Sequence, residues 1–156
     1  NDSIVAQIVK RFQKQDAIVI YVPDHGEECY EENRGFICRN HSAEIDWPLA
    51  HYEFEIPFWI YCSPKYIRNH RDIYRQIRKA KDKRFMTDAL PHLLLYLAGI
   101  ETPTYKEEYN ILSPKYDEMR PRILKNSADY DKLRDAHLEK IKKEESKKVK
   151  KKERRN

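Results

Sequence analysis

The stretch from Ala17 to Val22 is an unbroken run of apolar residues, rich in β-branched side chains and as long as one strand. A run that is apolar on both alternations is what a strand buried on both sheet faces requires, as in a parallel sheet. Pro23 has no N–H to donate to a neighbouring strand, so we expect the strand to end there. In open α/β sheets ligands bind outside the carboxyl ends of the strands, so a site is expected just after Val22.

Asp24, His25 and Gly26 follow the strand, and two further acids come directly after them. Asp24 and His25 offer a carboxylate oxygen and an imidazole nitrogen to one cation, and Gly26 permits a sharp backbone turn around it. A solvated acidic turn after a strand has the same composition, and the buried-strand context makes the two interpretations nearly equal. We expect the two side chains to converge at the carboxyl end of the Ala17–Val22 strand.

The length of 156 residues is enough for one hydrophobic core and is compatible with a single domain. No apolar run is long enough to cross a membrane, and no secretory signal opens the sequence. The sequence starts with Asn1-Asp2-Ser3, which is a helix cap without an initiator Met. We therefore expect the chain to be a piece of a longer protein, whose upstream part holds half of the site.

The net charge of +5 is concentrated at the end of the chain. From Glu139 to Asn156 there are ten Lys or Arg and four Glu, a balance of +6, which leaves −1 for everything before. A basic balance that belongs to a tail gives no ground for nucleic-acid binding by the rest of the chain. No nucleic-acid partner is therefore expected.

The first half of the sequence predicts a helix, a strand, a long irregular segment and a second strand. Apolar residues at helical spacing predict an amphipathic helix from Ser3 to about Lys14, which should pack on the sheet and make half of a βαβ unit. Its apolar face consists of Ile4, Val5, Ile8, Val9 and Phe12. The irregular segment runs to about Pro48, and a second strand is predicted between Phe54 and Pro64, centred on the enriched run from Phe58 to Cys62.

The second half of the sequence predicts three helical regions. The first is polar and extends from Pro64 to about Lys83. The next extends from Ala89 to Ala98, with Thr87 or Asp88 as its cap and Gly99 as its stop. Its expected buried face consists of Leu90, Leu93, Leu94 and Leu97. From about Ala128 the chain is helical again, and beyond Ile141 it becomes a Lys/Glu run that should be solvated or frayed.

Other residues with chemical potential stay open on the sequence alone. His41 lies in the irregular segment and could fold back to the strand end, on the same side of the sheet as Asp24, although a loop histidine is more often a surface residue than a ligand. His92 falls among leucines and is expected to be a packed or half-exposed helix residue. Cys29 and Cys38 flank a short loop and could form a disulfide in an oxidising compartment, which would leave Cys62 unpaired. The spacing is equally compatible with three free thiols.

The order of these segments resembles a known superfamily. Asp24-His25-Gly26-Glu27 after a strand is followed by His41, by the run from Phe54 to Ile60 and by the run from Thr87 to Ile100. This order resembles the carboxyl-terminal half of the sulfatase/alkaline-phosphatase superfamily, and most of all the membrane-anchored phosphoethanolamine transferases of Gram-negative bacteria, of the Bacteroides type. The resemblance implies a partial alkaline-phosphatase-like three-layer α/β/α fold with a mostly parallel sheet, plus a C-terminal basic helix. It assigns residues 1–126 to the catalytic domain and 127–156 to a charged helical tail.

The resemblance also implies a reaction and a ligand set. The family transfers phosphoethanolamine from phosphatidylethanolamine to a lipid A or core saccharide acceptor through a phospho-threonine intermediate. Asp24 and His25 match the family's adjacent zinc ligands, with manganese and calcium as alternative metals. His41, here within Asn40-His41-Ser42 where many members have His-Gly, matches a histidine that contacts the transferred phosphate or a second metal.

The resemblance places the nucleophilic threonine and a glutamate ligand upstream of this sequence. Thr87, Thr102 and Thr104 lie at the wrong positions to replace that threonine, so the chain by itself is expected to be inactive. The family anchors its parent chain in the bacterial inner membrane, with the catalytic domain in the periplasm. One alternative is another sulfatase-superfamily hydrolase or a phosphoglycerol transferase. A second is a non-catalytic binding module whose basic tail binds anionic lipid.

Overall fold

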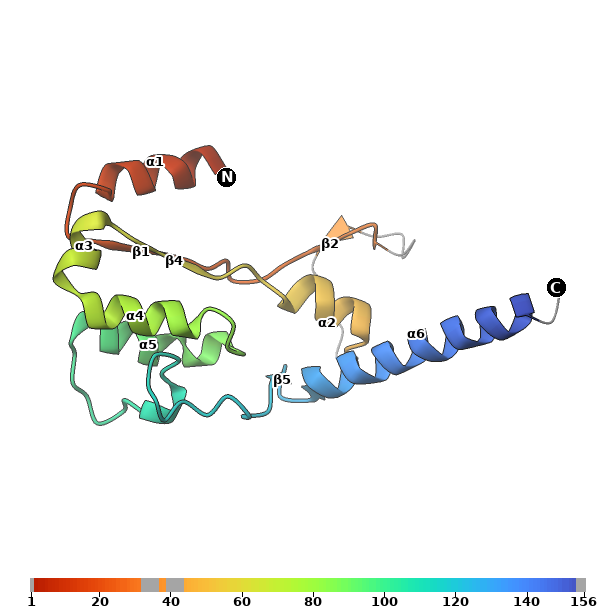
Figure 1. Cartoon of the computed structure of the whole chain (residues 1–156). Helices are drawn as coiled ribbons and strands as arrows, with labels where there is room; N and C mark the ends of the chain where they lie inside the picture. The colour runs from red at the N-terminus through yellow and green to blue at the C-terminus, as the bar shows by residue number, and fades with distance from the viewer. Residues whose placement is uncertain (1, 32–36, 39–43, 154–156) are drawn as a thin grey trace. The chain divides into compact units, whose positions relative to one another are not determined.

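The computed structural model describes residues 2–31, 37–38 and 44–153 (Figure 1). It splits into two compact units. Unit 1 comprises Asn1–Val22 and Pro57–Arg120, and unit 2 comprises Pro23–Ile56 and Pro121–Asn156. These units follow spatial contact, whereas the predicted boundary after residue 126 follows the family resemblance, and that boundary stays a prediction.

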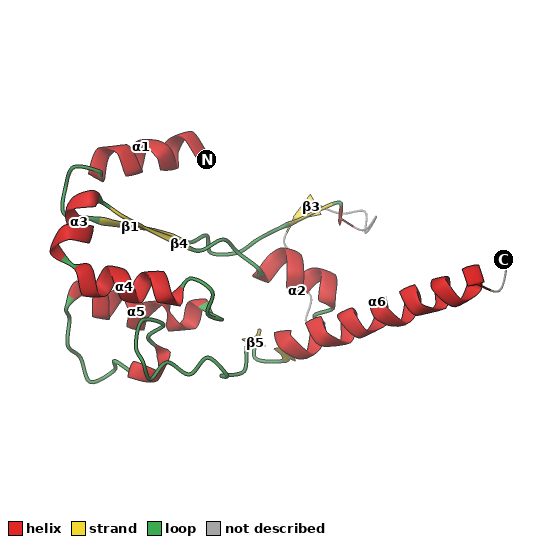
Figure 2. Cartoon of the chain, in the orientation of Figure 1, coloured by secondary structure: helices red, strands yellow, loops and turns green. Residues whose placement is uncertain are grey.

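Unit 1 combines helices with one pair of strands (Figure 2). Its elements in chain order are α1 (Asp2–Phe12), β1 (Ile18–Tyr21), β4 (Trp59–Cys62), α3 (Pro64–Asn69), α4 (Arg71–Ala80), the 3₁₀-helix η2 (Thr87–Ala89), α5 (Leu90–Ala98) and the 3₁₀-helix η3 (Glu107–Tyr109). Both predicted strands are present. The first lies within a residue of its expected ends, and the second occupies Trp59–Cys62 of the enriched run, whereas Phe54, at the start of the wider expected stretch, lies in a helix. The helical region after Pro64 is divided in two at His70.

The strands β1 and β4 pair antiparallel, with Ile18 opposite Cys62 and Tyr21 opposite Trp59. The prediction of a mostly parallel sheet is therefore wrong for the described residues. All four residues of each strand are half-buried. An apolar run indicates that a strand needs cover on its faces, but it carries no information on the direction of its neighbour. The fold class is α/β with small antiparallel sheets.

Ser63 joins the second strand to the helix that follows it. The Ser63 side chain is fully buried, and its hydroxyl donates to the Gln15 carbonyl at 2.6 Å. The same oxygen accepts the Tyr66 N–H at 3.0 Å, which caps the first turn of α3. One side chain thus ties the start of α3 to the turn before β1.

The helix α1 covers its apolar face only in part in this structure. No residue of α1 is buried, and Ile4 and Ile8 are 60% and 41% exposed. The predicted helix is thus confirmed, and the expected packing of its apolar face is present only in part, since Val5, Val9 and Phe12 are half-buried while Ile4 and Ile8 are not. The face has the composition of a packing surface without the full cover that such a surface normally has.

The core of unit 1 lies between β4, α4 and α5. Leu93 is fully buried there, together with Ala80, Ile111 and Leu112. Gly99 ends α5 with φ of 66°, the left-handed conformation that favours glycine, as predicted. Leu94, expected on the buried face, is instead 44% exposed. Leu90, Leu93 and Leu97 pack against the core, and Leu94 lies beside them on the helix. The apolar part of the helix surface is therefore wider than the part that packs.

The predicted caps of α5 are absent, because neither Thr87 nor Asp88 makes a capping hydrogen bond. The Asp88 carboxylate instead accepts two hydrogen bonds from the Arg120 guanidinium, at 2.5 and 2.8 Å. This bidentate pair lowers the pKa of Asp88, through the Arg120 hydrogen bond above all. Residues Thr87–Ala89 form a 3₁₀ turn ahead of α5, which leaves no ordinary cap position for them.

Among its described residues, unit 2 contains two short two-stranded ribbons, β2–β3 and β5–β6, and two helices. Its elements are β2 (Glu28–Cys29), β3 (Ile37–Cys38), α2 (Trp47–Phe54), β5 (Ile123–Leu124), β6 (Ala128–Asp129) and α6 (Tyr130–Glu153). Helix α2 lies in a stretch that the sequence predicts to be irregular up to Pro48 and a strand from Phe54. Its start signal is nevertheless present, since Asp46 accepts the Leu49 N–H at 3.0 Å and Pro48 occupies the first turn.

The core of unit 2 lies where α2 meets the start of α6. Ala50, Leu124 and Tyr130 are buried there, and Leu133 packs against them. Helix α6 is regular to Glu153, and from Leu138 to Lys148 every side chain is exposed. The predicted solvated Lys/Glu run is therefore confirmed to residue 148, as a helix.

In the described residues no helix is both long and apolar enough to cross a membrane. Cys29 and Cys62 are free thiols, and Cys29 pairs in the β2–β3 register with Ile37 and not with Cys38.

We predict that removal of residues 139–156 leaves the stability of the remaining chain almost unchanged. The exposed part of α6 buries little apolar area, so the melting temperature should fall by less than about 4 °C, equivalent to about 1 kcal/mol. Leu133→Ala is the matched control, because it removes a side chain that packs on α2 and should cost more. A larger fall for the truncated chain than for Leu133→Ala would contradict this description of the tail.

Candidate metal centre

Asp24 and His25 bring their side chains together at the start of unit 2. The Asp24 Oδ2 and His25 Nε2 atoms are 3.5 Å apart. The Asp24 carboxylate is 89% exposed and the His25 ring 26% exposed, so the pair is open to solvent on the carboxylate side. The predicted convergence of these two residues is thus present.

The tautomer of His25 is set by its backbone contact. Its Nδ1 lies 2.8 Å from the Gly26 carbonyl oxygen, which can only accept a hydrogen bond. Nδ1 must therefore carry the proton, and in the neutral ring Nε2 is left with its lone pair directed at the side where Asp24 lies. Histidine ligands of metals are commonly fixed in this way by a carbonyl behind the ring.

The separation of the two ligand atoms fits one tetrahedral zinc ion. Bonds of about 2.0–2.1 Å at tetrahedral angles place two ligand atoms about 3.3–3.4 Å apart. The observed 3.5 Å between Asp24 Oδ2 and His25 Nε2 needs almost no adjustment. No group of three His, Cys, Asp or Glu side chains among the described residues is arranged to hold a metal. The pair therefore offers two ligand atoms, one fewer than the three protein ligands that a catalytic zinc normally takes.

Gly26 holds the pair against the end of α2. Its N–H donates to the Glu53 carbonyl at 2.9 Å. A Cβ at position 26 would lie 2.1 Å from the Tyr52 carbonyl oxygen, which is far inside van der Waals contact. The glycine is thus required by close approach of two backbones. From the sequence, Gly26 was expected only in a turn, and this contact could not be foreseen because α2 was not predicted.

The orientation of α2 depends in turn on a polar network with α6. Tyr130 donates from its hydroxyl to Glu55, and His51 Nδ1 lies 3.0 Å from the same carboxylate. Burial by itself raises the pKa of Glu55, but these two hydrogen bonds outweigh it and lower the pKa below 4.5. Burial and the Glu55 bond raise the pKa of Tyr130 to about 12.

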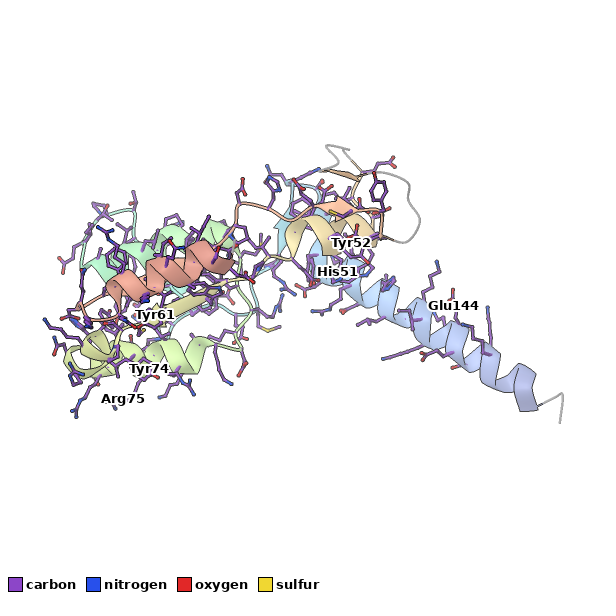
Figure 3. All side chains as sticks on the ribbon, turned by 90° about the horizontal axis from the view of Figure 1, so that it is seen from above. His51, Tyr52, Tyr61, Tyr74, Arg75 and Glu144 are labelled. Atoms are coloured by element: carbon purple, nitrogen blue, oxygen red, sulfur yellow. The ribbon has the colours of Figure 1, made fainter. Side chains whose placement is uncertain are left out.

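Aromatic rings extend the same contact between α2 and α6. The Trp47 ring stacks on His51 at 5.5 Å and on His137 at 5.4 Å between ring centres. Figure 3 labels His51 and Tyr52, two neighbouring residues of α2, and a second ring contact joins them at 4.8 Å. This ring cluster and the Tyr130–Glu55 hydrogen bond fix the position of α2. Helix α2 in turn carries the Glu53 carbonyl that accepts the Gly26 N–H and the Tyr52 carbonyl that lies close to Gly26.

The other residues with chemical potential do not join this site. His41 lies outside the described residues, so its predicted role stays a prediction. His92 is packed as expected, since its Nδ1 accepts the Lys106 N–H at 3.1 Å and its ring lies beside Tyr105 and Tyr109. Burial raises the pKa of Cys62, which disfavours the thiolate that a nucleophile needs.

Two solved structures resemble this chain, and both are crystal structures of the C-terminal periplasmic domain of EcEptC from Escherichia coli, a phosphoethanolamine transferase. The first shares 27% sequence identity with a TM-score of 0.66, and the second, a complex with Zn, shares 27% with a TM-score of 0.65. The match covers 85% of this chain but only 37% of the solved chain. No family model and no curated protein matches the sequence. The structural match agrees with the resemblance that the sequence shows.

We predict that Gly26→Ala destabilises the chain more than Gly99→Ala. The added Cβ at position 26 meets the Tyr52 carbonyl oxygen, so the two backbones must separate, at a cost of about 2 kcal/mol or more. At Gly99 a Cβ meets no atom within 4 Å, and the cost is the left-handed conformation alone, about 1 kcal/mol. Urea unfolding of both variants measures the difference. Equal losses would show that the close approach to α2 is not tight in solution.

We predict that Tyr130→Phe makes the chain less stable at neutral pH and less sensitive to acid. The variant loses the hydrogen bond to a half-exposed carboxylate, at a cost of about 1 kcal/mol. A lowered folded pKa of Glu55 stabilises the fold above the ordinary value of 4.5, and that contribution is lost as the pH falls through the folded pKa. The gap between wild type and Tyr130→Phe should therefore shrink as the pH falls below 4.5.

Urea unfolding at a series of pH values provides the measurement, and Tyr105→Phe provides the control. The Tyr105 hydroxyl accepts from the Asn110 amide and has no carboxylate partner in this contact, so its loss should not depend on pH in the acid range. A gap for Tyr130→Phe that stays constant between pH 7 and the acid limit would contradict the assignment of Glu55.

Proposed function

We propose, from the structural likeness to the periplasmic domain of a phosphoethanolamine transferase, that this chain supplies two zinc ligands to such an enzyme. The observation that carries the proposal is the Asp24–His25 pair. Its ligand atoms, Asp24 Oδ2 and His25 Nε2, lie 3.5 Å apart, and His25 Nδ1 is held by the Gly26 carbonyl. The Zn complex of the similar E. coli domain supports zinc over manganese and calcium. The parent enzyme acts in the periplasm and is anchored in the inner membrane.

The proposed reaction transfers phosphoethanolamine from phosphatidylethanolamine to a lipid A or core saccharide acceptor. The hydroxyl of a threonine upstream of these residues attacks the donor phosphorus, and diacylglycerol leaves as the bond from phosphorus to its glycerol oxygen breaks. The acceptor hydroxyl then attacks the phosphothreonine, and the threonine hydroxyl leaves. Zinc, when bound, lowers the pKa of a coordinated hydroxyl and shields phosphoryl charge. His41 contacts the transferred phosphate or a second metal. Residues 1–126 form the carboxyl-terminal part of the catalytic domain, and the tail after residue 126 takes no part in the chemistry.

In the proposed reaction, the residues of this chain hold and orient the two zinc ligands. The Asp24 carboxylate presents a negative ligand from the solvent side, and its second oxygen accepts the His25 N–H at 3.1 Å, which restrains the carboxylate. The Gly26 carbonyl keeps the His25 ring from rotating. A site with its ligands already placed loses little free energy to reorganisation when the metal enters.

We predict that Asp24→Ala or His25→Ala in the parent protein removes both bound zinc and transferase activity. Each substitution deletes one protein ligand of a zinc ion that normally takes three, and turnover should fall by about 100-fold or more. His41→Ala should lower zinc content less and turnover more, because its proposed contact is with phosphate. Zinc by mass spectrometry and turnover of a phosphatidylethanolamine analogue are the two measurements.

Asp82→Ala is the matched control, since Asp82 is an exposed acid paired with Lys81 in unit 1. It should keep both zinc and turnover. The chain of 156 residues by itself should show no turnover, because its threonines do not match the family's nucleophile. Retention of both zinc and activity by the Asp24 and His25 variants would refute the proposed site.

A further inference from the structure

The last part of α6 is a cationic helix without a role in the proposed chemistry. From residue 139 onward it carries ten Lys or Arg and four Glu, a balance of +6. Every side chain from Glu139 to Lys148 is exposed. A helix that is polar all round and packs on nothing is stable only through its own side-chain pairs or through a partner.

The positive charge is gathered on one side of this helix. At 100° per residue, positions 140, 143, 147, 150 and 151 fall within an arc of about 100°. We call these five positions the basic face; all are lysine. Glu139 and Glu144 lie at its two edges, and the other two glutamates lie on the opposite half of the helix. An even alternation of positive and negative charge around the helix would leave no side cationic. The arrangement found here gives the helix one cationic side.

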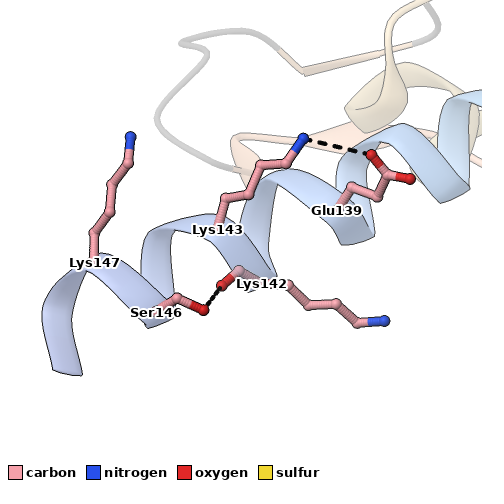
Figure 4. A pocket seen from close by; sticks show the side chains of 5 residues that line it. All are labelled: Glu139, Lys142, Lys143, Ser146 and Lys147. Atoms are coloured by element: carbon pink, nitrogen blue, oxygen red, sulfur yellow. Dashed lines mark hydrogen bonds and ion pairs between the residues drawn. The ribbon is translucent and has the colours of Figure 1, made fainter. Parts of the chain in front are cut away.

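Figure 4 shows this asymmetry in the described part of the helix. Lys143 and Lys147 extend to the same side, whereas Lys142 extends to another. The Lys143 ammonium lies 3.6 Å from the Glu139 carboxylate, at an exposed site where such a pair contributes little. The hydroxyl of Ser146 is turned back to the Lys142 carbonyl at 2.8 Å and adds no charge to either side.

We propose that the basic face of α6 binds the surface of a membrane that contains anionic lipid headgroups. Each lysine held near such a surface adds an attraction, and a regular helix can hold all five positions against one plane. The fifteen residues from 139 to 153 are about 22 Å long, so the helix can lie flat across several headgroups. Lipid is favoured over nucleic acid because the similar domain is periplasmic and because the proposed function, on which this choice rests, acts on membrane lipids.

The attachment is electrostatic and does not involve insertion into the bilayer. Ile141 and position 149 are the apolar positions beyond residue 139, and both fall outside the basic face. A helix that inserts needs a continuous apolar side opposite its charges. Binding should therefore be strongly sensitive to salt, since the Debye length falls from about 8 Å at physiological salt to about 3 Å at 1 M.

The test is co-sedimentation of the full chain with vesicles of phosphatidylcholine and phosphatidylglycerol, against vesicles of phosphatidylcholine alone. Lys140→Gln, Lys143→Gln and Lys147→Gln are combined in one variant, which should bind the anionic vesicles about 100-fold more weakly, at about fivefold per lysine. The matched control combines Lys142→Gln, Lys148→Gln and Lys152→Gln, which removes the same charge from the other side. It should lose only about fivefold, because those charges lie about one Debye length further from the surface.

Equal losses in the two triple variants, or equal binding of wild type to both kinds of vesicle, would overturn the basic face as a docking surface. Tighter binding per phosphate to duplex DNA than to anionic vesicles at physiological salt would overturn the choice of lipid. Asp24→Ala should bind vesicles like wild type. A failure of vesicle binding therefore rejects the role of α6 and leaves the zinc site to be judged on zinc content.

Discussion

The proposed metal centre depends on the close approach of Gly26 to the end of α2. The Asp24–His25 pair sits on a short connection that contains no regular secondary structure of its own. The Gly26–Glu53 backbone hydrogen bond and the space that only a glycine leaves beside Tyr52 fix this connection. The orientation of the two proposed ligands therefore depends on α2, and the orientation of α2 depends on its packing on α6.

The elements with strong local signals could be predicted from the sequence. The run from Ala17 to Val22 contains β1, and the aromatic run before Cys62 contains β4. Gly99 ends α5 because its backbone is left-handed, a conformation for which glycine is the usual residue. The Asp24–His25 pair could also be predicted, since adjacent ligand types after an apolar run are visible without any knowledge of tertiary contacts.

The features that depend on distant residues could not be predicted. The antiparallel direction of β1 and β4 is set by their connection and leaves no mark on composition. Helix α2 is only eight residues long, and it meets α6 through apolar side chains as well as through the Glu55–Tyr130 hydrogen bond just after its end, so its sequence has no clean apolar period. The apolar side of α1 was expected to pack on the sheet, because the spacing of its apolar residues is that of a packed helix. Ile4 and Ile8 nevertheless remain exposed in this chain. Spacing indicates that a surface needs a partner, but not where the partner lies.

Nitrogen NMR of the chain with ¹⁵N-labelled histidine, titrated with zinc, tests the central claim most directly. The chain has six histidines. Before zinc is added, the His25 signals should be those of a ring protonated on Nδ1, because that nitrogen faces the Gly26 carbonyl. On addition of zinc, the Nε2 resonance of His25 should shift while His92 and His137 stay unchanged. A His25 ring protonated on Nε2, or a His25 resonance that ignores zinc while other histidines respond, would contradict the assignment of Asp24 and His25 as a metal-binding pair.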